Sequence, residues 1–109
     1  MTPPATVVLT ELWTSFASVL RSYCAAHGLN STQQAVVEVS ADVITIRVAK
    51  RWLRIEHVNG KGTMLGSEGS VESFELQEDG TLRFPNGDVF DMDHAAERIA
   101  RELMAKAAA

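Results

Sequence analysis

The sequence predicts an α+β domain with an N-terminal helix, an antiparallel meander sheet of about five to seven strands and a C-terminal helix. We expect two layers, with both helices packed on the same face of the sheet. Both ends of the chain carry apolar residues at three- and four-residue steps, which is the period of a helix. The middle of the chain alternates apolar and polar residues, which is the period of a strand. The helical segments lie at the two ends of the chain and do not alternate with the strand segments. An antiparallel sheet is therefore favoured over βαβ units.

Length and composition set the class of protein. The chain has 109 residues, of which 46% are hydrophobic and 22% are charged, and its formal net charge is -4. This length supports one hydrophobic core, so we expect a single domain over residues 1–109, with flexible ends at about residues 1–5 and 106–109. The composition excludes a disordered tail, a collagen-like fibre and a disulfide-framework peptide.

The N-terminal helix is predicted over about residues 7–27. Pro3 and Pro4 prevent an earlier start. Gly28 is placed to end the helix in the left-handed conformation, with Leu29 folding back over the last turn. One face of this helix is apolar, and its members are Leu9, Leu12, Trp13, Phe16, Val19, Leu20, Tyr23 and His27. This spacing is typical of a helix with one buried side.

The first hairpin is predicted around a tight turn at Ala41-Asp42. A two-residue turn at this point sets Val39 opposite Ile44 and Val37 opposite Ile46. All four aliphatic side chains then lie on one face of the sheet, and this is the face that we expect the helices to cover.

The second hairpin is predicted around a turn at Lys50-Arg51. This turn sets Ile46 opposite Ile55 and Val48 opposite Leu53, which continues the same aliphatic face. The opposite face of these strands carries Val36, Glu38, Thr45, Arg47, Trp52, Arg54 and Glu56.

A glycine-rich stretch and a further hairpin follow. Residues 59–70 contain four glycines and are expected to form a turn, a short strand and a turn. A three-residue loop over residues 78–80, with Gly80 left-handed, closes the hairpin. Its cross-strand pairs are Phe74 with Phe84, Glu75 with Arg83 as an ion pair, and Leu76 with Leu82.

The chain closes with a short hairpin and a helix. Asn86-Gly87 is a strong hairpin pattern and folds Val89-Phe90 back on Arg83-Phe84. Asp91 or Asp93 caps the helix that follows. Its buried stripe is Ala96, Ile99, Ala100, Leu103 and Met104.

No motif in the chain predicts catalysis. The stretch Gly60-Lys61-Gly62-Thr63 combines glycines, a lysine and a hydroxyl, but a phosphate-binding loop needs a helix after it, so we expect a plain turn. Cys24 and His27 lie one helical turn apart, but His27 belongs to the apolar face and no oxyanion element flanks the pair. We therefore expect no catalytic residue and a protein that is not an enzyme.

No metal or cofactor site is predicted. Asp88, Asp91 and Asp93 lie close to His94 in the sequence. The spacings typical of zinc or calcium ligands are missing, and helix capping accounts for the carboxylates. We expect neither a metal nor a cofactor.

Cysteine content and the N-terminal sequence indicate a compartment. Cys24 is the only cysteine, so a reducing compartment is the simplest interpretation. Glu11 interrupts the apolar stretch that a signal peptide needs, and no apolar run approaches the ~18 residues that span a bilayer. We expect a cytoplasmic location and no membrane partner.

The charges are distributed unevenly. Residues 41–61 hold five Lys and Arg against two Asp and Glu, a net +3, whereas residues 62–93 hold eight Asp and Glu against one Arg, a net -7. The acidic total disfavours nucleic acid as a partner. The local split indicates a polarised surface instead.

The uncovered face of the central hairpin has two interpretations. In the predicted register Arg47 and Arg54 face each other, with Glu38 and Glu56 as diagonal neighbours, so a solvent-exposed salt-bridge ladder is the plainer one. The other is an interaction surface for protein, because tryptophan and arginine are enriched at interfaces. Its predicted members are Val36, Arg47, Trp52, Arg54 and Glu56.

The function predicted from these observations is that of a protein-interaction module. We expect a homodimer through the uncovered sheet face, with itself and other proteins as partners. The alternative is a binding protein for a small hydrophobic or anionic ligand, with a pocket between the curved sheet and the helices. The predicted lining of that pocket is Phe16, Tyr23, Phe74, Phe84, Phe90 and Met104.

Overall fold

The structure, a computed structural model, describes residues 5–28 and 35–108. The elements in chain order are α1 (Ala5–Gly28), β1 (Ala35–Val39), β2 (Val43–Val48), β3 (Arg51–Val58), β4 (Lys61–Gly66), β5 (Val71–Leu76), β6 (Leu82–Arg83), β7 (Val89–Phe90) and α2 (Met92–Ala108). The seven strands form one sheet in sequence order, and every neighbouring pair is antiparallel. The predicted meander is therefore confirmed.

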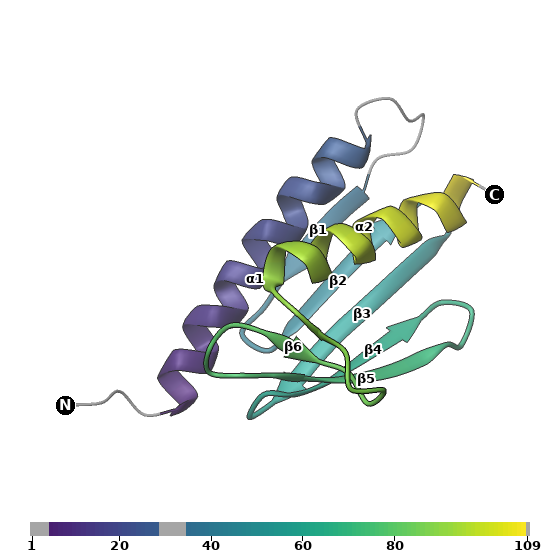
Figure 1. The fold of residues 1–109 in the computed structure, drawn as a ribbon. Coiled ribbons are helices and arrows are strands. Elements are labelled where there is room, and N and C mark those ends of the chain that lie inside the picture. Colours follow the sequence, from purple (N-terminus) through teal and green to yellow (C-terminus); the bar gives the residue numbers. More distant parts are fainter. Residues whose placement is uncertain (1–4, 29–34, 109) are drawn as a thin grey trace.

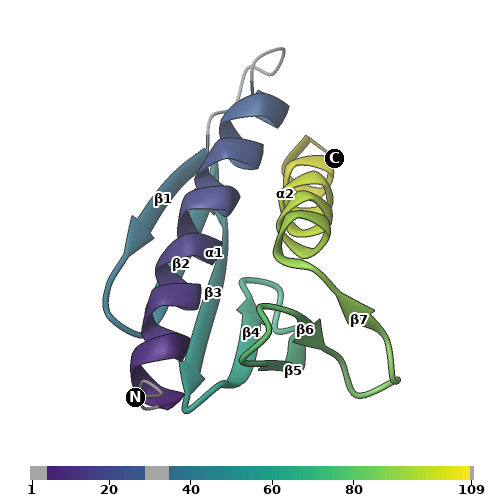
Figure 2. The same ribbon diagram turned by 60° about the vertical axis from the view of Figure 1, so that its left-hand side comes forward.

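The two helices lie side by side on the same face of the sheet, which gives the molecule two layers (Figure 1). β1, β2 and β3 run together as one layer behind α1, whereas β4 to β7 bend out of that layer (Figure 2). The sheet is thus a half-barrel. The predicted α+β class, with both helices on one face, is confirmed.

The hydrophobic core fills the space between the layers. α1 contributes Leu9, Trp13, Phe16, Ala17, Leu20 and Cys24. α2 contributes Ala95, Ala96, Ile99, Ala100, Leu103 and Met104. The sheet contributes Ile44, Ile46, Val48, Ile55, Met64, Phe74, Leu76, Leu82 and Phe84. Both predicted helix stripes face this core, with Leu12, Val19 and Tyr23 packed against its edge, except for His27, which is half-exposed and lies beside Glu97.

The first hairpin has the predicted register. Val39 lies opposite Ile44 and Val37 lies opposite Ile46. The backbone N–H of Ser40 donates to the carbonyl of Val43 at 2.8 Å, which closes a two-residue turn.

The second hairpin differs from its prediction. Its turn is Ala49-Lys50 rather than Lys50-Arg51, so Ile46 pairs with Leu53 instead of Ile55. A shift of two residues leaves every side chain on its original face, because side chains alternate with a period of two. Alternation in the sequence therefore could not separate the two registers.

The observed register also separates two like charges. Arg47 lies opposite Trp52 and Arg54 lies opposite Thr45, so the predicted Arg47–Arg54 pairing is wrong. Like charges directly opposite each other destabilise a sheet, which gives a physical reason for the observed choice.

The hairpin between β5 and β6 follows its prediction. Leu76 lies opposite Leu82 and Glu75 lies opposite Arg83. Gly80 has φ +88°, as a left-handed residue at the end of a three-residue loop requires. The carboxylate of Glu75 and the guanidinium of Arg83 do not approach within 4.0 Å in the described structure, so the predicted ion pair is not formed.

The hairpin between β6 and β7 differs by one residue. The Phe84 N–H donates to the carbonyl of Asp88 at 2.9 Å, so the turn holds three residues rather than Asn86-Gly87 alone. Phe90 consequently lies opposite Leu82. A one-residue change moves a side chain to the other face of a sheet, and here it brings the Phe90 ring to the helix side.

The predicted ends and the first helix cap lie at the limits of the described structure. α1 begins at Ala5 and its last residue is Gly28, while α2 ends at Ala108. Leu29, the residue predicted to fold back over α1, lies outside the described residues, as do residues 1–4 and 109.

Candidate functional site

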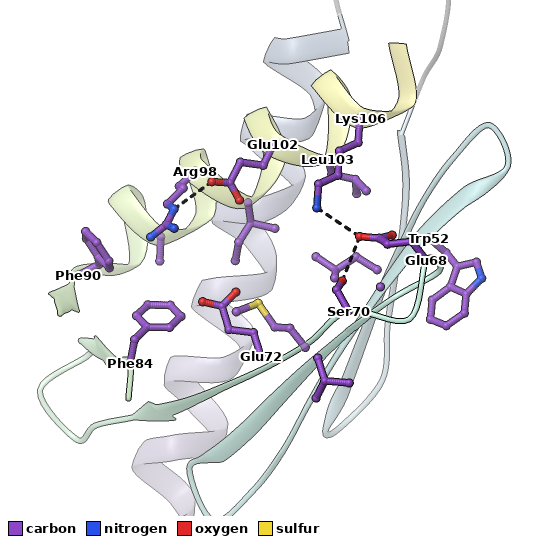
Figure 3. A pocket seen from close by; sticks show the side chains of 16 residues that line it. Trp52, Glu68, Ser70, Glu72, Phe84, Phe90, Arg98, Glu102, Leu103 and Lys106 are labelled. Atoms are coloured by element: carbon purple, nitrogen blue, oxygen red, sulfur yellow. Dashed lines mark hydrogen bonds and ion pairs between the residues drawn. The ribbon is translucent and has the colours of Figure 1, made fainter. Parts of the chain in front are cut away.

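A groove of about 280 Å³ lies between α2 and the bent part of the sheet (Figure 3). We call it the α2 groove. Its apolar lining is Trp52, Leu53, Met64, Val71, Phe84, Phe90, Ala95, Ile99 and Leu103. These side chains come from β3, β4, β5, β7, α2 and the loop after β6, so the groove is formed by the bent sheet and the helix together.

Charged side chains form the rim of the α2 groove. Arg98 donates from Nε to Glu102 Oε1 at 3.1 Å, and Lys106 donates from Nζ to Glu68 Oε1 at 3.2 Å. Glu72 also lines the groove but takes part in none of the ion pairs within the described structure. Arg98 and Lys106 are thus each paired with a carboxylate, whereas Glu72 has no ion-pair partner in the described structure.

Glu68, in the turn between β4 and β5, is joined to the end of α2 by its ion pair with Lys106. Hydrogen bonds from its own backbone N–H, from the Ser70 hydroxyl and from Lys106 lower the pKa of its carboxyl. Arg51 at the start of β3 adds a second cation, with Nη1 3.6 Å from Glu68 Oε2. At the other end of the groove the Arg98 guanidinium lies 5.6 Å from the centre of the Phe90 ring.

The position of Glu72 follows from strand alternation. Glu72 lies opposite Met64, a core residue, and two residues before Phe74 on the same strand. It therefore sits on the helix side of the sheet, and its side chain is seen in the groove in Figure 3. Sequence reasoning missed this residue, although the period of two through Phe74 and Leu76 places Glu72 on the same face.

The outer face is the face of the sheet that lies away from both helices. Across β1 to β5 its members are Val36, Glu38, Val43, Thr45, Arg47, Trp52, Arg54, Glu56, Val58, Lys61, Thr63, Leu65, Val71, Ser73 and Glu75. Five of the seven exposed large apolar side chains in the described structure lie on this face, namely Val36, Trp52, Val58, Val71 and Val89.

The predicted interaction residues are brought together on the outer face. Val36 lies opposite Arg47, which in turn lies opposite Trp52. Arg54 follows two residues after Trp52 on β3, and its Nη2 lies 3.4 Å from Oε2 of Glu56. The Trp52 residue is 37% exposed and lies beside two arginines, and it also lines the α2 groove.

The residues predicted to line a pocket lie in separate places. Phe84 and Phe90 line the α2 groove, and their ring centres are 5.7 Å apart. The other four, Phe16, Tyr23, Phe74 and Met104, pack in the core or against it and do not line this groove.

Cys24 and His27 do not face a shared site. Cys24 is 2% exposed, and burial raises the pKa of its thiol to about 11, so at neutral pH it is protonated. His27 turns instead toward α2, with Nε2 3.4 Å from Oε1 of Glu97.

The two remaining motifs are structural in the described chain. Gly60-Lys61-Gly62-Thr63 ends the turn after β3 and begins β4, so a strand follows the glycines. Asp91 caps α2, since the N–H of His94 donates to Asp91 Oδ1 at 2.7 Å. Within residues 5–28 and 35–108, no group of three or more His, Cys, Asp or Glu side chains is arranged so that it could hold a metal ion.

The fold and these surfaces define a class: a two-layer α+β half-barrel with a bare outer sheet face and a groove beneath its C-terminal helix. Comparison with models of protein families, with curated proteins and with solved structures finds no match to this chain. Neither helix, within its described residues, combines the length and the hydropathy that crossing a bilayer requires.

Proposed function

We propose that this protein is a non-enzymatic interaction module that forms a homodimer through its outer face. The observation that carries the proposal is that five exposed large apolar side chains lie on this face, with Trp52 among them. Single exposed apolar residues are ordinary on a protein surface, but several on one sheet face indicate a contact surface.

The charges of the outer face suit a second copy of the same chain. Arg47 Nη1 lies 3.8 Å from Glu38 Oε1, and Arg54 pairs with Glu56, so both signs occur within a small area. In a two-fold dimer each surface meets itself, and a surface that carries both signs can place the arginines of one copy against the carboxylates of the other.

The β1 edge of the sheet is a less suitable contact than the outer face. β1 is an edge strand, and Val37 forms a non-hydrogen-bonded pair with Ile46, which leaves the Val37 carbonyl pointing away from β2. Arg21 of α1 donates from Nη2 to that carbonyl at 3.4 Å. An edge whose acceptor is occupied by a charged side chain is protected against addition of another strand.

Sedimentation equilibrium across a wide range of protein concentration tests the proposal. We expect a reversible monomer–dimer equilibrium, and Trp52→Glu should weaken dimerisation by roughly tenfold or more, because an interface tryptophan is replaced by a charge. Acrylamide quenching gives a second measurement. Trp13 is buried and Trp52 is half-exposed, so quenching should decrease as the dimer forms.

Val7→Glu is the matched control. Val7 is exposed on α1, away from the outer face, so this variant introduces the same charge without touching the proposed contact. It should dimerise like the wild type. A wild-type protein that stays monomeric at every concentration, or a Trp52→Glu variant that dimerises unchanged, would overturn the proposed homodimer.

A further inference from the structure

We infer that the α2 groove binds a small organic cation with an apolar body, through the unpaired carboxylate of Glu72. Glu72 lies on the helix side of the sheet, whereas the proposed dimer contact is the outer face, and two outer-face residues, Trp52 and Val71, also line the groove. The inference goes beyond the proposed function, and its test depends on Glu72, which does not belong to the outer face.

The lining of the groove favours an apolar body. Phe84 and Phe90 present two rings, and Met64, Ile99 and Leu103 complete an aliphatic surface around them. Aromatic and aliphatic side chains with a few convergent polar groups are typical of small-molecule sites. Its volume of about 280 Å³ is at the lower end of such sites, so the occupant is a single ring or a short alkyl chain.

The rim of the groove favours a cation. Arg98 is engaged by Glu102, and Lys106 is engaged by Glu68, so neither offers a free positive charge to an anion. Glu72 is the carboxylate without an ion pair in the described part of the rim. The lining carries three carboxylates and two cations, and Arg51 beside the groove pairs with Glu68 as well, so what distinguishes Glu72 is that it has no ion pair of its own in the described structure.

Glu72 forms no ion pair with either charged pair, although its charge, after that of Glu102, helps to raise the pKa of Arg98. The Lys106–Glu68 pair closes one end of the groove, and the Arg98 guanidinium lies against Phe90 toward the other end (Figure 3). Glu72 lies between these ends in Figure 3 and is opposite Met64 on the neighbouring strand. An ammonium group at Glu72 therefore places its apolar substituent on the floor formed by Met64, Phe84 and Ile99.

Isothermal titration calorimetry with three matched probes tests the inference. 2-Phenylethylammonium, 2-phenylethanol and 3-phenylpropionate carry the same ring and differ in charge. We expect saturable binding of the ammonium, tighter than that of the alcohol by roughly twofold to fivefold, as a solvent-exposed ion pair contributes. The carboxylate should bind most weakly, because Glu72 repels it.

Two variants distinguish charge recognition from binding to the apolar floor. Glu72→Gln should remove the preference for the ammonium while keeping the weak binding of the alcohol. Glu75→Gln is the matched control, since Glu75 lies on the same strand and points to the outer face. It should keep the preference. Absence of saturable binding, equal affinity for all three probes, or a preference that survives Glu72→Gln would overturn the inference.

Discussion

The ring of Phe74 lies directly over Gly62 on the neighbouring strand. The two residues are opposite each other in the ladder between β4 and β5, and a Cβ atom added to Gly62 would meet the Phe74 ring. Phe74 thus occupies the space that a side chain would take in the middle of a strand. A glycine inside a strand often marks such a close approach.

Gly62→Ala should lower the free energy of unfolding by about 1–3 kcal/mol, because the added methyl group forces the buried Phe74 ring to move. Urea denaturation measures this change. In a Phe74→Leu background the same substitution should cost less, and the difference is the coupling between the two positions. Additive effects of the two substitutions would show that Phe74 does not restrict Gly62.

Ala49→Gly should stabilise the protein by about 0.5–1 kcal/mol. Ala49 has φ 54° at the first position of the turn between β2 and β3, a conformation that costs an alanine more than a glycine. Thermal and urea denaturation measure the gain. Ala41→Gly, in the turn between β1 and β2, is the control and should lower stability by a few tenths of a kcal/mol, because Ala41 has no positive φ.

His57 should make stability depend on pH. Its ring centre lies 4.3 Å from that of Trp13, its Nδ1 accepts from the Gly60 N–H at 3.3 Å, and burial lowers the pKa of its imidazole, with a smaller opposing effect of Asp42. Because the imidazole pKa is lower in the folded state than its ordinary value of 6.5, the neutral imidazole contributes stability at pH values above 6.5. This stability is lost as the pH falls through the folded-state pKa.

Urea denaturation at pH values from about 7.5 to about 5 should therefore show a loss of stability that His57→Gln reduces. The same substitution at His94, on an exposed position of α2, is the control, since it removes an imidazole without disturbing the contact with Trp13. Parallel pH profiles for the wild type and His57→Gln would contradict the assignment to His57.

Asp91→Ala should cost about 1 kcal/mol of stability, because it removes the acceptor for the N–H of His94 at the start of α2. Asp91→Asn should retain most of the stability, since asparagine is an equally good cap. Equal losses for the two variants, measured by urea denaturation, would show that the charge and not the hydrogen bond is what matters at this position.

The Cys24 thiol should react slowly with a disulfide reagent such as Ellman's reagent near pH 8. Its side chain is buried, and a pKa of about 11 leaves little thiolate at that pH. The absorbance of the released chromophore measures the rate, which should rise by orders of magnitude in unfolding concentrations of urea. Fast reaction of the native protein would show that the helix pair opens readily around Cys24.

The two helix stripes, the inner aliphatic face and the loop at Gly80 could be predicted because each is a local pattern. The apolar residues of α1 and α2 repeat at the helical period. Gly80 occupies the left-handed position of the three-residue loop, and this loop length pairs Leu76 with Leu82. Such patterns depend on neighbours a few residues away, so the sequence by itself determines them.

The turn at Ala49-Lys50, the bend of the sheet and the α2 groove were decided by the tertiary structure. A two-residue shift of β2 against β3 preserves the alternation, so only cross-strand contacts such as Arg47 with Trp52 choose the register. The position of Phe90 likewise depends on one residue in a turn. The groove needs β3, β4, β7 and α2 together, and the distance between them is set by how side chains far apart in the chain pack in three dimensions.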